Sequence, residues 1–264
     1  MRTFWLTVIF ACLFQMMVPA VHATGMRSLE TEEWSRLANQ VAKWAGAGEY
    51  IKARDQLLKL SGRFSKADFT KLNLRIESIH ALAEVIMEME GALNRVQPNS
   101  KEIADAAARL QLAFDALTHP NQPMWQQYYQ PLKKDLDMID EAIRMNDRHA
   151  VQEGVDQFYE HYQIIRPALI VAKSPFTISK VDSLVTFLRN QTEMDKLKIG
   201  VTQLKSLLNP LFFGSERDVM ATVYRWNEGD FFKVILWVSG LIASVLGFVS
   251  WRKNRENREA SPYA

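Results

Sequence analysis

Apolar residues recur along most of the chain at alternating intervals of three and four positions. An early example is the series Trp34, Leu37, Val41 and Trp44, and no segment shows sustained alternation of apolar and polar residues. Intervals of three and four are typical of α-helices with one apolar face. The pattern therefore predicts amphipathic helices within residues 34–44, 50–64, 69–93, 103–117, 128–143, 151–165, 181–188 and 197–208.

Helix-breaking residues separate these segments. Gly46 and Gly48 follow the first segment, and the turn at residues 119–123 contains two prolines. Pro98 breaks the chain before another segment, which Asn99 is placed to cap. Each predicted helix has a single apolar face that it must bury against its neighbours. We therefore expect an all-α domain, either an up-and-down bundle or a stack of helical hairpins.

The N-terminal residues are typical of a secretory signal. Arg2 precedes an apolar run, residues 4–18, which is shorter than the roughly 20 apolar residues of a membrane-spanning helix. Small side chains at Val21 and Ala23 suit cleavage after Ala23. We predict that residues 1–23 are a cleaved signal peptide, and an uncleaved membrane anchor is the alternative.

A second apolar segment, residues 231–251, is interrupted only by Lys233. It is long enough to cross about 30 Å of hydrocarbon as a helix. Basic residues follow it at once, which predicts a cytoplasmic tail at residues 252–264. The helical domain, residues 24–212, is then extracytoplasmic and joined to the cell membrane through a linker at residues 213–230. The signal peptide independently requires the same orientation, and a buried core helix is the alternative to the span.

Small residues lie four positions apart within the predicted span. The pairs are Gly240 with Ser244 and Ala243 with Gly247. Such spacing lets two helix backbones approach closely, so it predicts self-association in the membrane. The alternative is that these residues have no role in assembly, because small residues are common in membrane-spanning helices.

Composition and motifs exclude several functions. The net charge of +2 produces no strong field to attract nucleic acid. The single cysteine, Cys12, lies in the predicted signal, so the mature chain would have no disulfide and no cysteine nucleophile. No glycine-rich phosphate loop, paired-histidine zinc motif or G-x-S-x-G motif occurs. We identify no cofactor, no catalytic residue and no nucleic-acid partner, and we expect a protein that is not an enzyme.

His149 and Glu153 are the candidates for a metal site. They lie four positions apart on one predicted helix face, and Asp156 and Glu160 continue that line. Carboxylate and imidazole groups at helical spacing hold divalent ions in some bundles. This interpretation would make the domain a metal or ligand sensor. The simpler alternative is a solvated polar face, because the opposite face of the same helix is apolar.

Asp135, Asp137, Asp140 and Glu141 form an acidic run beside two lysines. Paired carboxylates perform glycoside hydrolysis, which would suit an enzyme that acts on the cell wall. Such a pair needs a cleft, and no part of the sequence predicts one. Mixed charges on an exposed helix face are the more common explanation.

Trp125, Tyr128 and Tyr129 follow the proline turn. Exposed aromatic residues beside a turn form surfaces for protein partners or glycans. Burial of Trp125 between helices is the alternative, since large aromatic residues usually complete cores. Arg109 and Asp115 lie in the same region and would need partners, such as each other, if both point into the domain.

Three stretches of the chain resemble the sporulation protein YpjB family. They are Trp34-x-x-Leu37-Ala38 continuing through Gly48-x-Tyr50-x-x-Ala53-x-x-x-Leu57 to Phe64, Arg109-Leu110-x-x-Ala113-Phe114-Asp115-Ala116-Leu117 with Gln122-Pro123-x-Trp125, and Phe158-x-x-x-Tyr162-x-x-Ile165-x-Pro167-x-Leu169. The order of signal, helical region and C-terminal span is similar too. The resemblance implies a membrane protein of endospore-forming bacteria with a role in sporulation and no established activity. It supplies no catalytic residues.

Together these observations predict a membrane-anchored, non-enzymatic protein in the envelope during spore formation. Its helical domain would bind a protein partner or self-associate. A metal- or ligand-sensing domain and a cell-wall enzyme are the two alternatives.

Overall fold

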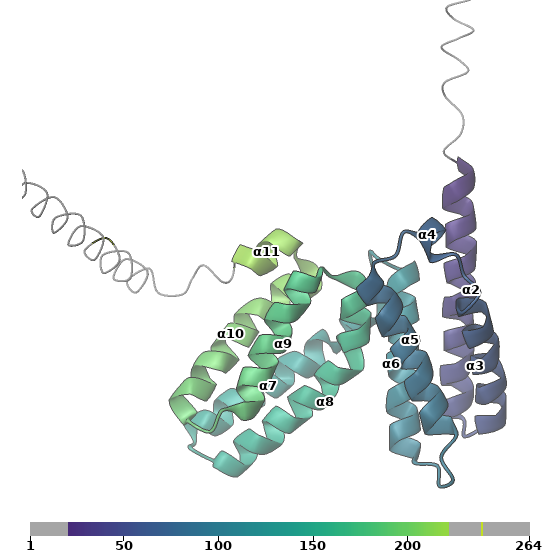
Figure 1. Ribbon diagram of the computed structural model, residues 1–264. Coiled ribbons are helices and arrows are strands. Elements are labelled where there is room, and N and C mark those ends of the chain that lie inside the picture. Colours follow the sequence, from purple (N-terminus) through teal and green to yellow (C-terminus); the bar gives the residue numbers. More distant parts are fainter. Residues whose placement is uncertain (1–20, 222–238, 240–264) are drawn as a thin grey trace, which may run out of the picture. The chain divides into compact units, whose positions relative to one another are not determined.

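The computed structural model describes residues 21–221 and residue 239, and every regular element among them is helical (Figure 1). The prediction of an all-α chain is confirmed for these residues. Within them, no helix combines the length and the apolar character needed to cross a bilayer. Apart from Ser239, the predicted span lies outside the described residues, as do Gly240, Ala243, Ser244 and Gly247, the cytoplasmic tail, and residues 1–20 of the predicted signal peptide.

The chain divides into two compact units, residues 1–216 and 217–264. The helices in chain order are α2 (Val21–Gly46), α3 (Tyr50–Phe64), α4 (Phe69–Leu72), α5 (Ile76–Leu93), α6 (Ser100–Thr118), the 3-10 helix η1 (Met124–Tyr128), α7 (Tyr129–Arg144), α8 (Arg148–Ala172), α9 (Pro175–Asn190), α10 (Met194–Phe213) and α11 (Glu216–Ala221). The first unit contains α2 to α10. Helix α10 ends next to the predicted domain boundary after residue 212, and α2 begins inside the predicted signal peptide.

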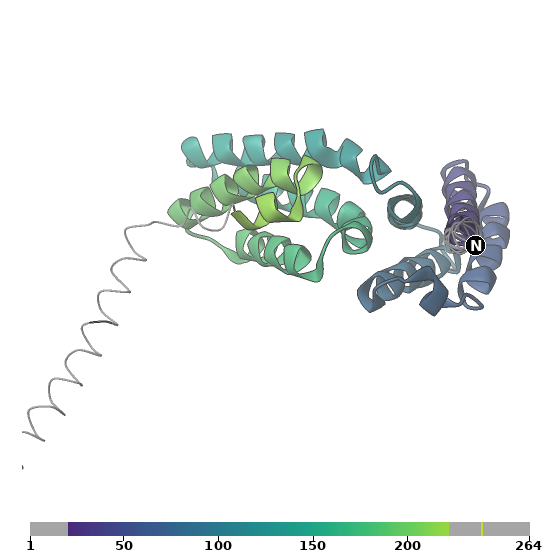
Figure 2. The ribbon, with the colours of Figure 1, turned by 90° about the horizontal axis from the view of Figure 1, so that it is seen from above.

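Consecutive helices of the first unit pack as hairpins. The pairs are α2 with α3, α5 with α6, α7 with α8, and α9 with α10. Helix α6 also packs on α2 and α8, while α7 packs on α10, so neighbouring hairpins share helix–helix contacts (Figure 2). The result is a bundle assembled from helical hairpins, in which each amphipathic helix buries its apolar face against at least two others.

The α2–α3 and α5–α6 hairpins enclose an aromatic and aliphatic core. The Trp34 ring is fully buried and packs edge-on against Phe64 and Phe114, with ring centroids 5.2 Å and 6.3 Å apart. Leu37, whose position in the sequence pattern predicted burial, is buried there too. Edge-to-face aromatic pairs at these distances add about 0.5–1.5 kcal/mol each to the gain from burial.

The predicted helix at residues 69–93 is wrong in one respect, because the chain breaks after Leu72. Asn73 adopts a left-handed conformation with φ 48°, which asparagine tolerates better than most residues. The helix resumes at Ile76. Between the two pieces, the Arg75 guanidinium donates hydrogen bonds to the carbonyl oxygens of Ile170 and Val171, at 2.8 and 3.1 Å. Arg75 thereby fastens the start of α5 to the last turn of α8.

Side-chain caps begin two of the central helices. The Asn99 side chain accepts hydrogen bonds from the backbone N–H groups of Lys101 and Glu102, which confirms its predicted capping of α6. Asp147 accepts equivalent bonds at the start of α8. A good N-cap contributes about 1 kcal/mol to stability. Local sequence therefore sets where these helices begin, and packing sets how they meet.

Candidate functional site

A groove with a volume of about 990 Å³ opens between α5, α8 and α9. Helices α5 and α9 both pack on α8, which supplies Arg166 and Ile170 to the groove. Residues of α5 and α9 form its two walls. We call this recess the α5–α9 groove. The anchoring of α5 to α8 through Arg75 fixes the position of one wall.

One face of α9 lines the groove along the whole helix. Lining positions from Pro175 to Asn190 recur at helical spacing, with Ile178, Asp182 and Thr186 between them. At 1.5 Å per residue, this face is about 22 Å long. Helix α9 buries its other side, including Val181, Val185 and Leu188. The sequence pattern identified that buried side and left the remaining face without an assignment.

The groove lining is mainly apolar where it meets solvent. Ile76 at the start of α5 is 81% exposed, and Phe187 on α9 is 38% exposed. Small side chains lie between these residues, namely Ala81 on α5 and Ser179 and Ser183 on α9. Exposed apolar side chains beside small residues leave space for a second surface to approach closely. Such a recess can bind an apolar ligand or another protein surface.

An ion pair crosses the groove between α8 and α9. The Arg166 guanidinium donates two hydrogen bonds to the Asp182 carboxylate, at 2.9 and 2.8 Å, and the buried Tyr162 hydroxyl donates a third at 2.6 Å. The pKa of Arg166 is raised chiefly by the hydrogen bond to Asp182. Burial, then the Asp182 charge, raises the pKa of Tyr162. The three groups hold α9 against α8 and satisfy the Asp182 carboxylate.

The α5 wall is acidic. Glu77 and Glu84 line the groove seven positions apart, with His80 between them, and all three are exposed. The His80 ring nitrogen Nδ1 lies 3.9 Å from a Glu84 carboxylate oxygen. No ion pair involves Glu77 among the residues that the structure describes. Since Arg166 neutralises Asp182, the two α5 glutamates give the groove a net negative charge.

The predicted metal candidates lie on an exposed helix face. His149 and Glu153 are 84% and 71% exposed, with 3.6 Å between Nδ1 and the nearer carboxylate oxygen. Asp156 accepts hydrogen bonds from Gln152, and Glu160 pairs with a lysine on α6. In the described part of the chain, no three histidine, cysteine or acidic side chains gather as metal ligands would. The geometry fits the solvated-face alternative.

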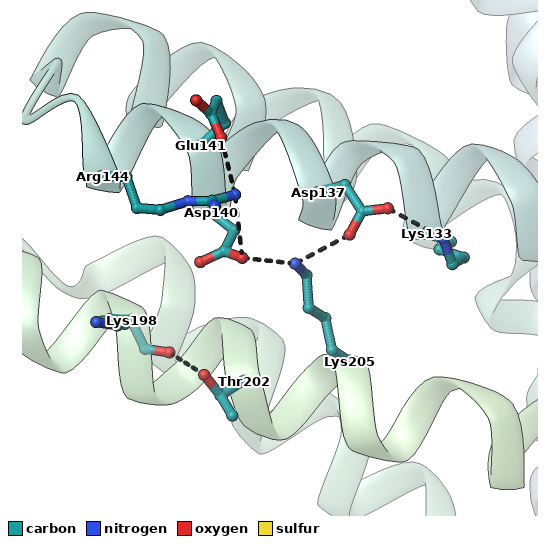
Figure 3. A network of polar contacts seen from close by, with 8 residues as sticks. All are labelled: Lys133, Asp137, Asp140, Glu141, Arg144, Lys198, Thr202 and Lys205. Atoms are coloured by element: carbon teal, nitrogen blue, oxygen red, sulfur yellow. Dashed lines mark hydrogen bonds and ion pairs between the residues drawn. The ribbon is translucent and has the colours of Figure 1, made fainter.

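The acidic run on α7 divides between two faces of the helix. Asp135 is buried, and its carboxylate lies 2.6 Å from Nδ1 of His161 on α8. Asp137 and Asp140 face α10 instead, where Lys205 Nζ lies 2.9 and 2.8 Å from their carboxylate oxygens (Figure 3). Glu141 pairs with an arginine on the same helix, at 2.8 Å.

These carboxylates therefore do not line a common cleft as the glycosidase hypothesis required. The hydrogen bond from Lys205, and then that from Lys133, lowers the pKa of Asp137. The Lys205 bond also lowers the pKa of Asp140. Ionised carboxylates that bridge two helices through one ammonium group stabilise the α7–α10 contact.

The aromatic residues after the proline turn pack inside the domain. Trp125 is 2% exposed, and its ring packs edge-on against Phe212 of α10 at 5.0 Å. Tyr129 packs against Phe212 and Phe213, and Tyr128 is half-buried beside His161. The structure therefore shows the alternative, burial of Trp125 between helices. Its indole therefore is not available as the centre of a binding surface.

Arg109 and Asp115 each have a partner, but they do not pair with one another. Arg109 donates to Glu88 at 2.9 Å. Asp115 is buried and accepts bonds from the backbone N–H of Met124 and from the ring of His119, at 2.5 and 2.8 Å. The possible pairing of the two with each other does not occur, because Asp115 instead closes the turn that leads into η1.

The sequence of this chain was compared with protein families, curated proteins and solved structures. The model of the sporulation protein YpjB family matches residues 31–261. The uncharacterized protein YpjB of Bacillus subtilis (strain 168) is 19% identical over 175 residues, which are 65% of this chain and 64% of that protein. The matched part thus spans less than two thirds of that relative. No solved structure shows significant similarity. Because the family model covers most of the sequence, this chain belongs to the sporulation protein YpjB family.

Proposed function

We propose that this protein is a non-enzymatic, membrane-anchored component of the sporulation envelope that binds a protein partner in the α5–α9 groove. Family membership indicates the role in sporulation. The observation that supports binding is the open groove itself, which one face of α9 lines along its length, with apolar side chains exposed at Ile76 and Phe187. An exposed apolar recess with polar residues around it is typical of a protein-interaction site.

A helix is the partner element that fits this groove. Three helices that enclose an elongated apolar recess leave the position of a fourth helix of a bundle unfilled. Proteins bind amphipathic helices in grooves of this kind, with apolar residues at every third or fourth position as anchors. The exposed lining on α5 and α9 would then be buried against the apolar face of that helix.

Placement outside the cytoplasm belongs to the same proposal. The N-terminal signal and the basic residues after the C-terminal apolar segment each support an exported domain attached to the membrane. A partner would then be bound in the envelope, at a fixed distance from the bilayer. The predicted linker at residues 213–230 would set that distance.

Filling the groove tests the binding function. The double substitution Ser183→Tyr and Thr186→Tyr places two large side chains on the open face of α9, at exposed positions. We expect sporulation efficiency to fall to the level of a strain that lacks the gene. The matched control is Thr202→Tyr with Ser206→Tyr, two exposed positions on α10 outside the groove.

Both double variants must accumulate to the wild-type level and show the same melting temperature for the comparison to be valid. Normal sporulation with a filled groove would refute the proposal. An equal defect in both variants would do so as well, since the effect would then not depend on the groove.

Cysteine labelling tests the topology. Cys12 is the single cysteine of the chain, so a Cys12→Ala variant has none. Adding Val96→Cys to that variant introduces one cysteine that can be labelled. Val96 is fully exposed between α5 and α6. We expect a membrane-impermeant maleimide to label this cysteine in intact protoplasts. A Ser261→Cys variant in the predicted tail should react only after permeabilisation. The opposite labelling pattern would overturn the orientation.

A further inference from the structure

We propose that the occupant of the α5–α9 groove is a basic amphipathic helix of about four turns, supplied by another protein. This inference rests on the proposed function and specifies the chemistry of the partner. Length, side-chain size and charge of the groove lining each constrain the occupant, and charge argues against a second copy of this chain and against its segment at residues 222–230.

The length of the groove sets the length of the helix. The open face of α9 runs from Pro175 to Asn190, which corresponds to about 22 Å of helix. A partner helix that lies along this face needs about 15 residues to cover it. Ser179, Ser183 and Ala81 are small, so the partner backbone can approach α9 and α5 closely. Larger apolar side chains of the partner would then contact Ile76, Ile170 and Phe187.

The charge of the groove sets the charge of the helix. Asp182 is satisfied by Arg166 and Tyr162, so neither ion of that pair is available to a ligand. Glu77 and Glu84 remain, exposed and two turns apart on the α5 wall. A partner helix that runs beside α5 meets them with lysine or arginine residues seven positions apart. Such pairing lies at the rim, where charge complementarity selects partners and speeds their association.

The same charges oppose a second copy of this chain as the occupant. A symmetric dimer through the groove places the same surface on both sides of the interface. Both copies would then present a groove of the same net negative charge, and like charges across an interface are unfavourable. The following segment of this chain, residues 222–230, is also a poor match, because Arg225 is outnumbered there by Glu228 and Asp230.

A helix-display selection tests the inference with the full-length protein in detergent micelles. The library fixes apolar residues at every third or fourth position over 15 residues and randomises the others among lysine, glutamate, glutamine and serine. We expect the selected helices to be enriched in lysine. They should bind wild-type protein and the Thr202→Tyr/Ser206→Tyr control equally, and lose measurable binding to the Ser183→Tyr/Thr186→Tyr variant.

Charge reversal on α5 gives the decisive comparison. The double substitution Glu77→Lys with Glu84→Lys should raise the Kd of the selected helices about tenfold. Each exposed ion pair lowers the Kd by up to about fivefold, and the substitutions replace these attractions by repulsion. The matched control is Glu153→Lys with Glu160→Lys, which reverses two exposed glutamates with the same spacing on α8. This control should leave binding unchanged.

Each other result has a definite meaning. Selected helices that depend on the groove but are neutral or acidic would overturn the charge inference and leave the proposed function in place. Recovery of no groove-dependent helix would overturn both. Sedimentation that shows a dimer abolished by groove filling would identify a second copy as the occupant. A disulfide between Thr186→Cys and Val223→Cys in the Cys12→Ala background would identify the chain's own segment, and either result would refute a separate partner.

Discussion

The contact between α7 and α8 can be tested directly by mutation. The two helices approach closely at Gly154, where glycine has no Cβ atom. A Cβ atom added there would lie 2.8 Å from Cγ1 of Ile139 on α7. Gly154 is buried, and Ile139 is completely inaccessible to solvent. Cγ1 is an inner atom of a β-branched side chain, so it cannot swing away without moving the rest of the residue. Gly154→Ala must therefore shift α7, α8 or both.

The expected change in stability is the sum of two opposing effects. Replacing glycine by alanine inside a helix stabilises by about 0.5–1 kcal/mol, because the unfolded chain loses conformational freedom. Overpacking a close-packed contact costs about 1–3 kcal/mol. We expect Gly154→Ala to destabilise the protein by about 1–2 kcal/mol. Urea unfolding of the full-length protein in detergent, followed by helical circular dichroism, measures the difference.

Gly62 on α3 and Gly91 on α5 provide matched controls, since both are exposed and no atom lies within 4 Å of an added Cβ at either position. Gly62→Ala should stabilise by about 0.5–1 kcal/mol. Combining Gly154→Ala with Ile139→Ala should cost less than the sum of the two single changes, because the second substitution removes the clashing atom. Stabilisation by Gly154→Ala, or strict additivity in the double variant, would refute the close α7–α8 contact.

Two further predictions concern polar contacts between helices. Lys205→Met should cost about 1 kcal/mol at pH 7, because it removes the ammonium group that Asp137 and Asp140 share. Since both folded-state pKa values lie below the ordinary 3.8, this contribution is present above about pH 4 and lost as pH falls through the lowered values. The difference in unfolding free energy between wild type and Lys205→Met should thus be smaller at pH 3 than at pH 7. An equal difference at both pH values would show that Asp137 and Asp140 do not cause it. Asp182→Ala should cost about 2–3 kcal/mol, since Arg166 and Tyr162 lose their acceptor; an unchanged unfolding midpoint would contradict this role.

Local sequence was sufficient to predict most helices, because the signals that start, stop and orient a helix lie within a few residues. The apolar period identified the buried face of nearly every helix, and Asn99 marked the start of α6 correctly. The error after Leu72 has a tertiary cause. Arg75 bonds to carbonyl groups at the end of α8, about a hundred residues away in the chain, and these bonds favour a break where the local pattern continues.

The burial of Asp135 could have been predicted from the apolar pattern of the sequence. Asp135 lies three positions after Leu132 and four before Ile139, so it falls on the apolar face of α7. A charged residue on such a face requires a buried partner. The identity of that partner, His161, depends on the register between α7 and α8. Asp137 and Asp140 lie on the other face, which is why they meet Lys205 instead.

The groove emerges only when α5 and α9 are placed on α8. Its lining comes from segments that are far apart in the chain, residues 76–84 on one wall and residues 175–190 on the other. An amphipathic pattern tells which side of each helix is apolar, because side chains repeat with the helical period. It contains no information on which remaining face lacks a neighbour. That depends on the angles and spacings at which the helices pack, and these are properties of the whole assembled domain.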